Sequence, residues 1–195
     1  MSNSFRTQRE DVVARRKATE QHLRVIERRP FPGDCHPISK SDLEILLAVI
    51  PVEMVHGLHS IELRPRNHEV GGPFAQYRIK AKSIILYSVP HSWEFDSFYP
   101  SLAREVGNAG AEVTSEGGRM RVVWPDEDRL RLWYFFDVFG HELGHHFDHQ
   151  FEHKNGRSAD RRAAERFAEL NSAKLREHVA RIMKEKKANR VPGSD

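Results

Sequence analysis

The chain contains very little cysteine: Cys35 is the only one among 195 residues. A single cysteine cannot form an internal disulfide, so the class of disulfide-stabilised secreted domains is excluded. The sequence also lacks an apolar run approaching the roughly 18–20 residues of a membrane span, and no secretory signal pattern opens it. Internal repeats and low-complexity tracts are absent as well. We therefore expect a cytoplasmic protein that makes no membrane contact, built as one domain with terminal extensions.

The small net charge of +3 conceals an uneven distribution of basic and acidic residues along the chain. Residues 1–30 carry eight basic and four acidic side chains, and residues 157–190 carry eleven and five, whereas residues 31–156 carry twelve and eighteen. Basic ends could approach nucleic acid, but Lys and Arg are mixed with Glu there, as on solvated faces. We expect a peptide or protein substrate as the partner, with basic or neutral peptides weakly favoured, and nucleic acid as the less favoured one.

Three segments are predicted. Residues 1–36 are expected to form a basic helix (6–29) and a linker, residues 37–188 the main domain, and residues 189–195 a disordered tail. The linker contains Cys35, whose thiolate could cap a zinc ion from a latency segment. An inert cysteine is the interpretation we favour.

The first part of the main domain contains the patterns of both helices and strands. Helices are predicted at 41–47, 51–56 and 99–108, the first of them with a capping box at Ser41–Glu44. Strands are predicted at 58–63, 74–79, 83–89, 112–115 and 119–124. Residues 91–99 are rich in aromatic side chains and are predicted to be a loop at the rim of a cleft.

The motif His141-Glu142-x-x-His145 carries the chemistry of the chain. On a helix, positions four apart lie about 40° apart around the axis, so both imidazoles can reach one Zn²⁺ with bonds of about 2.0–2.1 Å. Glu142 is rotated by roughly 100° from His141 and can reach a water at the metal rather than the metal itself. This four-position pattern is only moderately specific, and the surrounding sequence decides its meaning.

The motif lies within an amphipathic pattern. Apolar residues recur at steps of three or four from Arg129 to Phe151, which predicts one helix of about 25 residues that is buried along one side. Gly140 and Gly144 lie in its interior, where glycine weakens a helix by roughly 0.5–1 kcal/mol relative to alanine. Their spacing indicates that another backbone or a substrate comes close, the alternative being loose helix packing.

A catalytic zinc usually has three protein ligands and one open position. His149 is excluded as the third ligand, because the eight residues after His141 span about 12 Å of a straight helix. The longer pattern H-E-x-x-H-x-x-G-x-x-H is also absent, since Asp148 and Phe151 occupy the positions of its glycine and last histidine.

The residues after the motif predict a helical hairpin. Residues 154–157 predict a helix stop, and either Ser158 or Asp160 can cap a second helix. The apolar positions expected to pack this second helix are Ala163, Phe167, Leu170, Leu175, Val179 and Ile182.

An antiparallel pair of helices brings together residues whose numbers are symmetric about the turn. With the centre at Asn155, Glu165 returns beside His145 and completes a His-His-Glu set for Zn²⁺. Glu169 returns beside His141 and could accept a hydrogen bond from its ring N–H without binding the metal itself. The alternative for both glutamates is a solvated, charged helix face.

Taken together, these residues resemble the gluzincin branch of zinc metallopeptidases. The histidine motif is followed twenty residues later by Glu165-x-x-x-Glu169, which is similar to the thermolysin-type Glu-x-x-x-Asp element with Glu in place of Asp. Residues 164–169 look like the third-ligand helix of the anthrax lethal factor peptidase group, and His141–His145 with His149 is similar to small bacterial ImmA/IrrE-type peptidases. The lethal-factor group has a tyrosine where this chain has Ser158.

The resemblance covers about residues 124–175 and implies an α+β, zincin-like fold. Its expected form is a small mixed sheet followed by an active-site helix and an antiparallel third-ligand helix. It also implies an edge strand that binds extended substrate. The strand pair 74–79 and 83–89 is similar to that element, and 119–124 is the other candidate edge.

The predicted activity is peptide hydrolysis by a zinc-activated water, with Glu142 as general base. A second donor to the developing oxyanion is expected, and Tyr77, Tyr99 and His91 stay open as candidates, whereas Tyr134 is better placed for the core. A regulatory or DNA-associated module that keeps the fold is the alternative function. A purely structural zinc is disfavoured, because it needs no general base.

Overall fold

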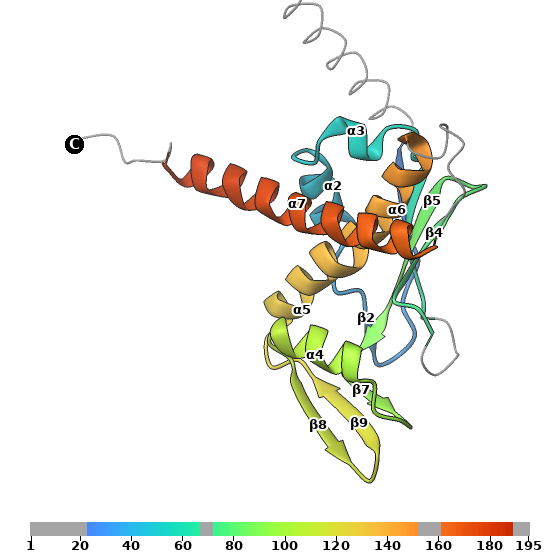
Figure 1. Cartoon of the computed structure of the whole chain (residues 1–195), viewed down its shortest axis with the longest axis vertical. Helices are drawn as coiled ribbons and strands as arrows, with labels where there is room; N and C mark the ends of the chain where they lie inside the picture. The colour runs from blue at the N-terminus through green and yellow to red at the C-terminus, as the bar shows by residue number, and fades with distance from the viewer. Residues whose placement is uncertain (1–22, 67–71, 152–160, 189–195) are drawn as a thin grey trace, which may run out of the picture.

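The computed structural model describes residues 23–66, 72–151 and 161–188, which contain both helices and strands (Figure 1). The strands form small sheets, and several helices pack beside them, so the mixed α and β class expected from the sequence is confirmed. Within the described ranges, no helix is both long enough and apolar enough to span a membrane.

The largest sheet has four strands in the order β1-β3-β5-β4. Strands β1 (Arg24–Glu27), β3 (Ser60–Arg64) and β5 (Ser83–Tyr87) run parallel, and β4 (Ala75–Arg78) pairs antiparallel with β5. Residues 83–86 of the central strand β5 are all buried, as expected for a strand covered on both faces. Strand β4 lies at the edge of the sheet, beside helix α6 (Gly140–Phe151).

A three-stranded antiparallel sheet is built from β7 (Ser92–Phe95), β9 (Arg119–Val123) and β8 (Glu112–Glu116). The β8–β9 hairpin turns at Gly117 and Gly118, whose φ angles of 57° and 79° suit the two-residue turn with positive φ at both central positions. The short strands β2 (Asp34–Cys35) and β6 (Val89–Pro90) form a third pair. The strands predicted at 112–115 and 119–124 are therefore confirmed.

Three short helices precede the motif of His141, Glu142 and His145: α2 (Lys40–Leu47), α3 (Val52–Val55) and α4 (Pro100–Asn108). Their predicted positions are confirmed, but the capping box of α2 lies two residues earlier than expected. Ser39 accepts from the backbone of Asp42, and the Asp42 carboxylate accepts from the backbone of Ser39. Ser39 is extended while Ser41 is helical, which decides which serine can cap.

The predicted single helix of residues 129–151 is interrupted. It consists of α5 (Glu127–Trp133), a π-helical segment η1 (Tyr134–Phe139) and α6. Tyr134, Phe136, Val138 and Phe139 are all buried in η1, whose turns are wider than those of an α-helix. On a regular α-helix these four positions would not lie on one face. Since η1 ends directly before α6, it also sets how the motif at the start of α6 is rotated.

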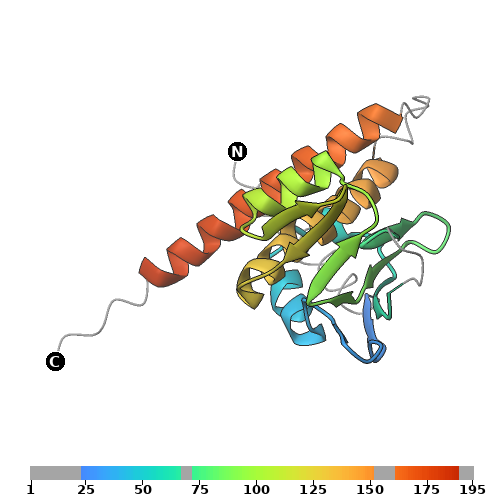
Figure 2. The same ribbon diagram turned by 90° about the horizontal axis from the view of Figure 1, so that it is seen from below.

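Helix α7 (Arg161–Ala188) runs antiparallel to α6 and projects beyond the rest of the described chain (Figures 1 and 2). The two backbones meet where Gly144 faces Ala168: a Cβ atom added at Gly144 would lie 2.7 Å from the Cα atom of Ala168. Only glycine at position 144 allows this approach. The expected helix is confirmed, but Leu170, expected in its apolar stripe, is 60% exposed.

Two sequence predictions are wrong. Residues 24–27 form strand β1 rather than the end of a basic helix, because parallel pairing with β3 and the packing of Val25 on the core outweigh the local helical pattern. Residues 92–95 form strand β7 rather than a loop at a cleft, and Trp93 is only 4% exposed. Trp93 packs within 5.8 Å of Trp124 and 5.5 Å of Trp133, ring centre to ring centre, in the core.

Several predicted features lie outside the described residues. They are the basic helix before residue 23, the helix stop at 154–157, the caps Ser158 and Asp160, and the tail 189–195. Within the described part, β1 and β2 pair with later strands, so these portions of the predicted 1–36 segment belong to the sheets.

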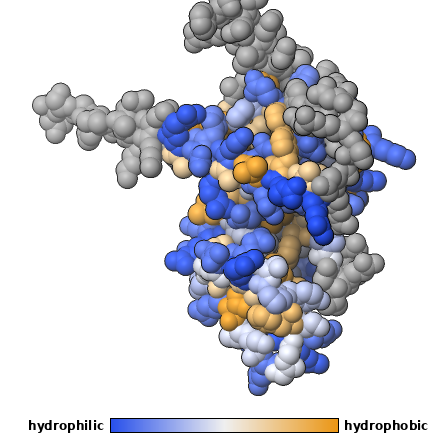
Figure 3. All heavy atoms as spheres, viewed as in Figure 1, coloured by the Kyte–Doolittle hydropathy of each residue, from blue (hydrophilic) through white to orange (hydrophobic). Residues whose placement is uncertain are grey.

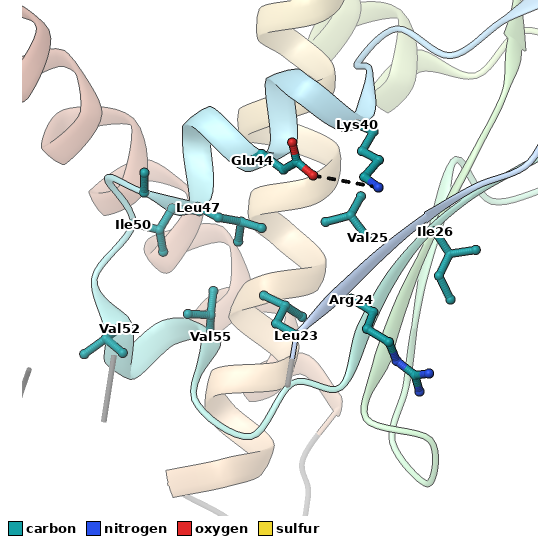
Figure 4. Close-up of a pocket in the computed structure, with 11 residues that line it drawn as sticks. Leu23, Arg24, Val25, Ile26, Lys40, Glu44, Leu47, Ile50, Val52 and Val55 are labelled. Carbon is teal, nitrogen blue, oxygen red and sulfur yellow. Dashed lines mark ion pairs between the residues drawn. The ribbon is translucent and has the colours of Figure 1, made fainter. Parts of the chain in front are cut away.

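The visible surface alternates between apolar and hydrophilic side chains, with apolar groups exposed in separate patches (Figure 3). An apolar groove of about 610 Å³ lies between β1 and helices α2 and α3 (Figure 4). Leu23, Val25, Leu47 and Val55 contribute to its lining. None of its lining residues belongs to the motif of His141, Glu142 and His145.

Candidate metal centre

Two histidines of α6 and one glutamate of α7 converge on a single point. The Nε2 atoms of His141 and His145 lie 3.0 Å apart. Oε2 of Glu165 lies 3.2 Å from the first and 3.6 Å from the second. These side chains form the one group of three or more potential ligands found in the described part of the chain. The structure therefore brings together the three residues that the sequence predicted as ligands.

The spacing of these three atoms fits a metal ion. Neighbouring ligand atoms of a tetrahedral ion with bonds of about 2.0–2.1 Å lie about 3.3 Å apart, close to the three measured separations of 3.0, 3.2 and 3.6 Å. Two imidazoles and a carboxylate are a ligand set typical of catalytic zinc. Their side chains are between 22% and 44% exposed, which leaves room for an ion and a water.

The site depends on the crossing of α6 and α7. Gly144 precedes His145 directly, and Ala168 lies one turn after Glu165, so the close approach at these two residues carries the carboxylate to the imidazoles. A second contact places Gly140 opposite Ser172. The residue numbers of both pairs are symmetric about position 156, one residue beyond the centre predicted at Asn155. The predicted register of the two helices is therefore off by one residue.

Glu142 is hydrogen-bonded to the edge strand β4. The backbone N–H of Tyr77 donates to Oε2 of Glu142 over 2.6 Å. Burial raises the pKa of Glu142, and the hydrogen bond from Tyr77 opposes that shift. Burial and the neighbouring His141 lower the pKa of His145, which favours the neutral imidazole that binds metals.

The sequence analysis missed His146, which links α6 to β4. The side chain is fully buried, and its Nε2 lies 3.0 Å from the backbone carbonyl of His56. A carbonyl can only accept, so Nε2 carries the proton and Nδ1 accepts from the Tyr77 hydroxyl at 3.1 Å. Burial lowers the pKa of His146 to about 4, which keeps the ring neutral. Its position three residues after Leu143, on the buried stripe, was the available signal.

A cavity of about 520 Å³ lies against the motif. It is bounded by α4, the residues that lead into β4, η1 and α7. Its lining residues are Pro73, Phe74, Ala75, Leu102, Glu105, Trp133, Asp137, Val138, His141, Glu142, Glu169 and Ser172. A peptide segment could thus reach His141 and Glu142 from the solvent.

Glu169 lines this cavity, as His141 does. Among the described residues, no hydrogen bond joins Glu169 to the His141 ring, so its role as partner of that ring stays a prediction. His149 does not join the metal-binding group, and its ring lies edge-on to that of Tyr77 with 6.2 Å between ring centres. Cys35 does not join the group either; it lies in β2, where burial raises the pKa of its thiol.

The predicted oxyanion donors are not gathered at the site. The Tyr134 hydroxyl is buried and donates to the carbonyls of Phe74 and Tyr87, which confirms its place in the core. The Tyr77 hydroxyl is used by His146. Tyr99 is 47% exposed and packs on Phe95, and His91 is exposed. Neither of these two lines the cavity.

Comparisons with models of known protein families, with curated proteins and with solved structures found no match to this chain.

Proposed function

We propose that this chain is a zinc-dependent peptidase with a zincin-like fold and a gluzincin-type ligand set. The observation that carries the proposal is the convergence of His141, His145 and Glu165 on one point, with Glu142 on the adjacent face of the same helix. A structural zinc would not need a carboxylate in that place. The reaction class follows from the ligand set and the general base together: hydrolysis of an amide bond.

His141, His145 and Glu165 would hold the zinc ion. When bound, zinc lowers the pKa of a water toward about 7 and polarises the carbonyl of the substrate. Glu142 accepts the proton of the attacking water and later delivers it to the leaving amine. Because the Tyr77 N–H holds Oε2, the carboxylate keeps a fixed orientation, and Oε1 is the oxygen available for that proton.

An extended substrate would pair with the edge strand β4. Phe74 is hydrogen-bonded to Tyr87 of the neighbouring strand, so the alternate residues Ala75 and Tyr77 turn their backbone groups outward. Tyr77 uses its N–H for Glu142, and Ala75 lines the cavity. Outward-facing backbone at the mouth of the cavity suits β-augmentation by a peptide.

Metal analysis combined with a peptide-library cleavage assay tests this function. Wild type is expected to retain about one zinc per chain and to cleave peptides, whereas Glu142→Gln should retain zinc and lose cleavage. His59→Ala, which changes an exposed histidine outside the ligand set, is the control and should behave as wild type. A wild-type protein that retains no zinc after reconstitution, or a Glu142→Gln variant that still cleaves, would contradict the proposal.

A further inference from the structure

The cavity beside the motif has an unbalanced charge. Four carboxylates line it, and neither Lys nor Arg occurs among its lining residues. The carboxylates belong to Glu105, Asp137, Glu142 and Glu169. A substrate group that enters this space therefore meets negative charge from α4, η1, α6 and α7.

Two of the four carboxylates are already engaged. Both oxygens of Asp137 accept from Nη2 of Arg176 at 2.6 Å, so this charge is balanced by a cation outside the cavity. Glu142 is held by the backbone of Tyr77 and serves the proposed reaction. Neither Asp137 nor Glu142 is therefore the group that selects the substrate.

Glu105 and Glu169 carry the unbalanced charge. Glu105 accepts a hydrogen bond of 3.1 Å from the Trp133 indole, a neutral donor. No Lys or Arg of the described chain forms an ion pair with Glu105 or Glu169. Because Glu105 lies on α4 and Glu169 on α7, the two side chains face the cavity from separate elements.

The remaining wall of the cavity is apolar. Phe74, Leu102 and Trp133 line it together with the carboxylates. A long side chain with an apolar stem and a cationic head matches this combination, since the stem can pack on apolar groups while the head reaches the carboxylates. Aromatic side chains in the wall also favour a cation.

We propose that this cavity binds a Lys or Arg side chain of the substrate, next to the bond that is cleaved, and that Glu105 and Glu169 determine this specificity. The inference rests on the proposed peptidase function. Contiguity with His141 and Glu142, rather than the acidic residues by themselves, identifies the cavity as a substrate site.

The test begins with the zinc-loaded full chain and a library of peptides whose cleaved bonds are mapped by mass spectrometry. Lys and Arg should be enriched at one position flanking the cleaved bond. Two fluorogenic peptides are then compared that differ only in Arg or its neutral isostere citrulline at that position. Wild type should prefer the Arg peptide in kcat/KM by roughly tenfold or more.

The variant Glu105→Gln/Glu169→Gln should bring the Arg-to-citrulline ratio close to one. The amide introduced by Glu105→Gln keeps an oxygen that can accept from the Trp133 indole, so the fold of the wall is preserved. Glu112→Gln/Glu116→Gln removes the same charge from the exposed strand β8 and is the matched control, with an unchanged ratio expected.

Two outcomes overturn the specificity. They are cleavage without enrichment of Lys or Arg, and a double Gln variant that keeps the Arg-to-citrulline ratio, whether or not both peptides are cleaved more slowly. In each of these cases wild type still cleaves peptides, and the proposed function stands. Absence of any cleavage by zinc-loaded wild type overturns the proposed function and the specificity together.

Discussion

The two sides of helix α6 perform different tasks. On the α7 side, the backbones meet at Gly144 and Ala168, and Glu165 reaches the imidazoles. On the β4 side, Tyr77 donates to Glu142 through its backbone and to His146 through its hydroxyl. The α7 side is thus expected to determine whether metal is retained, and the β4 side how the general base is oriented. Changes on the two sides should be separable by experiment.

Removal of Glu165, the proposed third ligand, should have the largest effect. Glu165→Gln replaces the carboxylate by a neutral amide, and we expect zinc affinity to fall by about 100-fold or more, together with the peptidase activity. Zinc content after dialysis against a competing chelator measures this change. Glu177→Gln, at an exposed position of the same helix, should retain wild-type zinc. Full zinc retention by Glu165→Gln would remove α7 from the metal site.

The helix crossing should be the next most sensitive feature. In Gly144→Ala, the added methyl group meets the Ala168 backbone at 2.7 Å, and overpacking of this kind costs about 1–3 kcal/mol in the free energy of unfolding. Because the helices must separate, zinc affinity should fall as well.

Gly107→Ala makes the same substitution in α4, where the nearest atom is 4.0 Å from the added methyl group. This control should raise the free energy of unfolding by about 0.5–1 kcal/mol. Chemical denaturation of the zinc-free proteins measures both variants. Equal stability changes would mean that the crossing at Gly144 is not tight.

A change on the β4 side should reduce turnover without loss of metal. Tyr77→Phe removes the hydroxyl that donates to His146 but keeps the backbone N–H for Glu142. We expect a loss of about 1 kcal/mol in stability and a several-fold lower kcat, because β4 is held less firmly against α6. Tyr99→Phe, at an exposed tyrosine, is the control. Zinc loss in Tyr77→Phe would show that the two sides of α6 are not independent.

The smallest effect is expected at the contact between α7 and the π-helical segment. The Ser172 hydroxyl donates to the carbonyl of Phe136, a buried hydrogen bond whose loss costs about 0.5–1.5 kcal/mol. Ser172→Ala should therefore lower the free energy of unfolding slightly and leave zinc content unchanged. Ser115→Ala, on the exposed strand β8, should change neither. A large loss of zinc in Ser172→Ala would extend the metal site to this contact.

Local pattern was sufficient where neighbouring residues decide the structure. The hairpin of residues 112–124 follows from its Gly117-Gly118 turn, and α4 follows from Pro100 at its start and its apolar spacing. The local sequence pattern failed where pairing with a distant strand decides the secondary structure. Residues 24–27 become a strand only because β3 offers them a partner, and 92–95 because β9 does.

The proximity of Glu165 to His141 and His145 could be predicted because helical periodicity and the symmetry of a hairpin are simple geometry. The register was wrong by one residue, since the close approach of Gly144 to Ala168 places the two helices. The π-helical segment and the role of His146 could not be predicted. Both depend on what packs around the helix: the spacing of His146 from Leu143 indicates burial but does not reveal its partners Tyr77 and His56.

By itself, the sequence determined which chemical groups the site contains. They are two imidazoles and a carboxylate at helical spacing, together with a second carboxylate on the next helix. Only the tertiary structure decided which backbone donates to Glu142 and which carboxylates face the cavity without a cation. The reason is that helical spacing acts over a few residues, whereas orientation and charge balance are set by residues far apart in the chain, such as the Tyr77 backbone and Glu142 or Arg176 and Asp137.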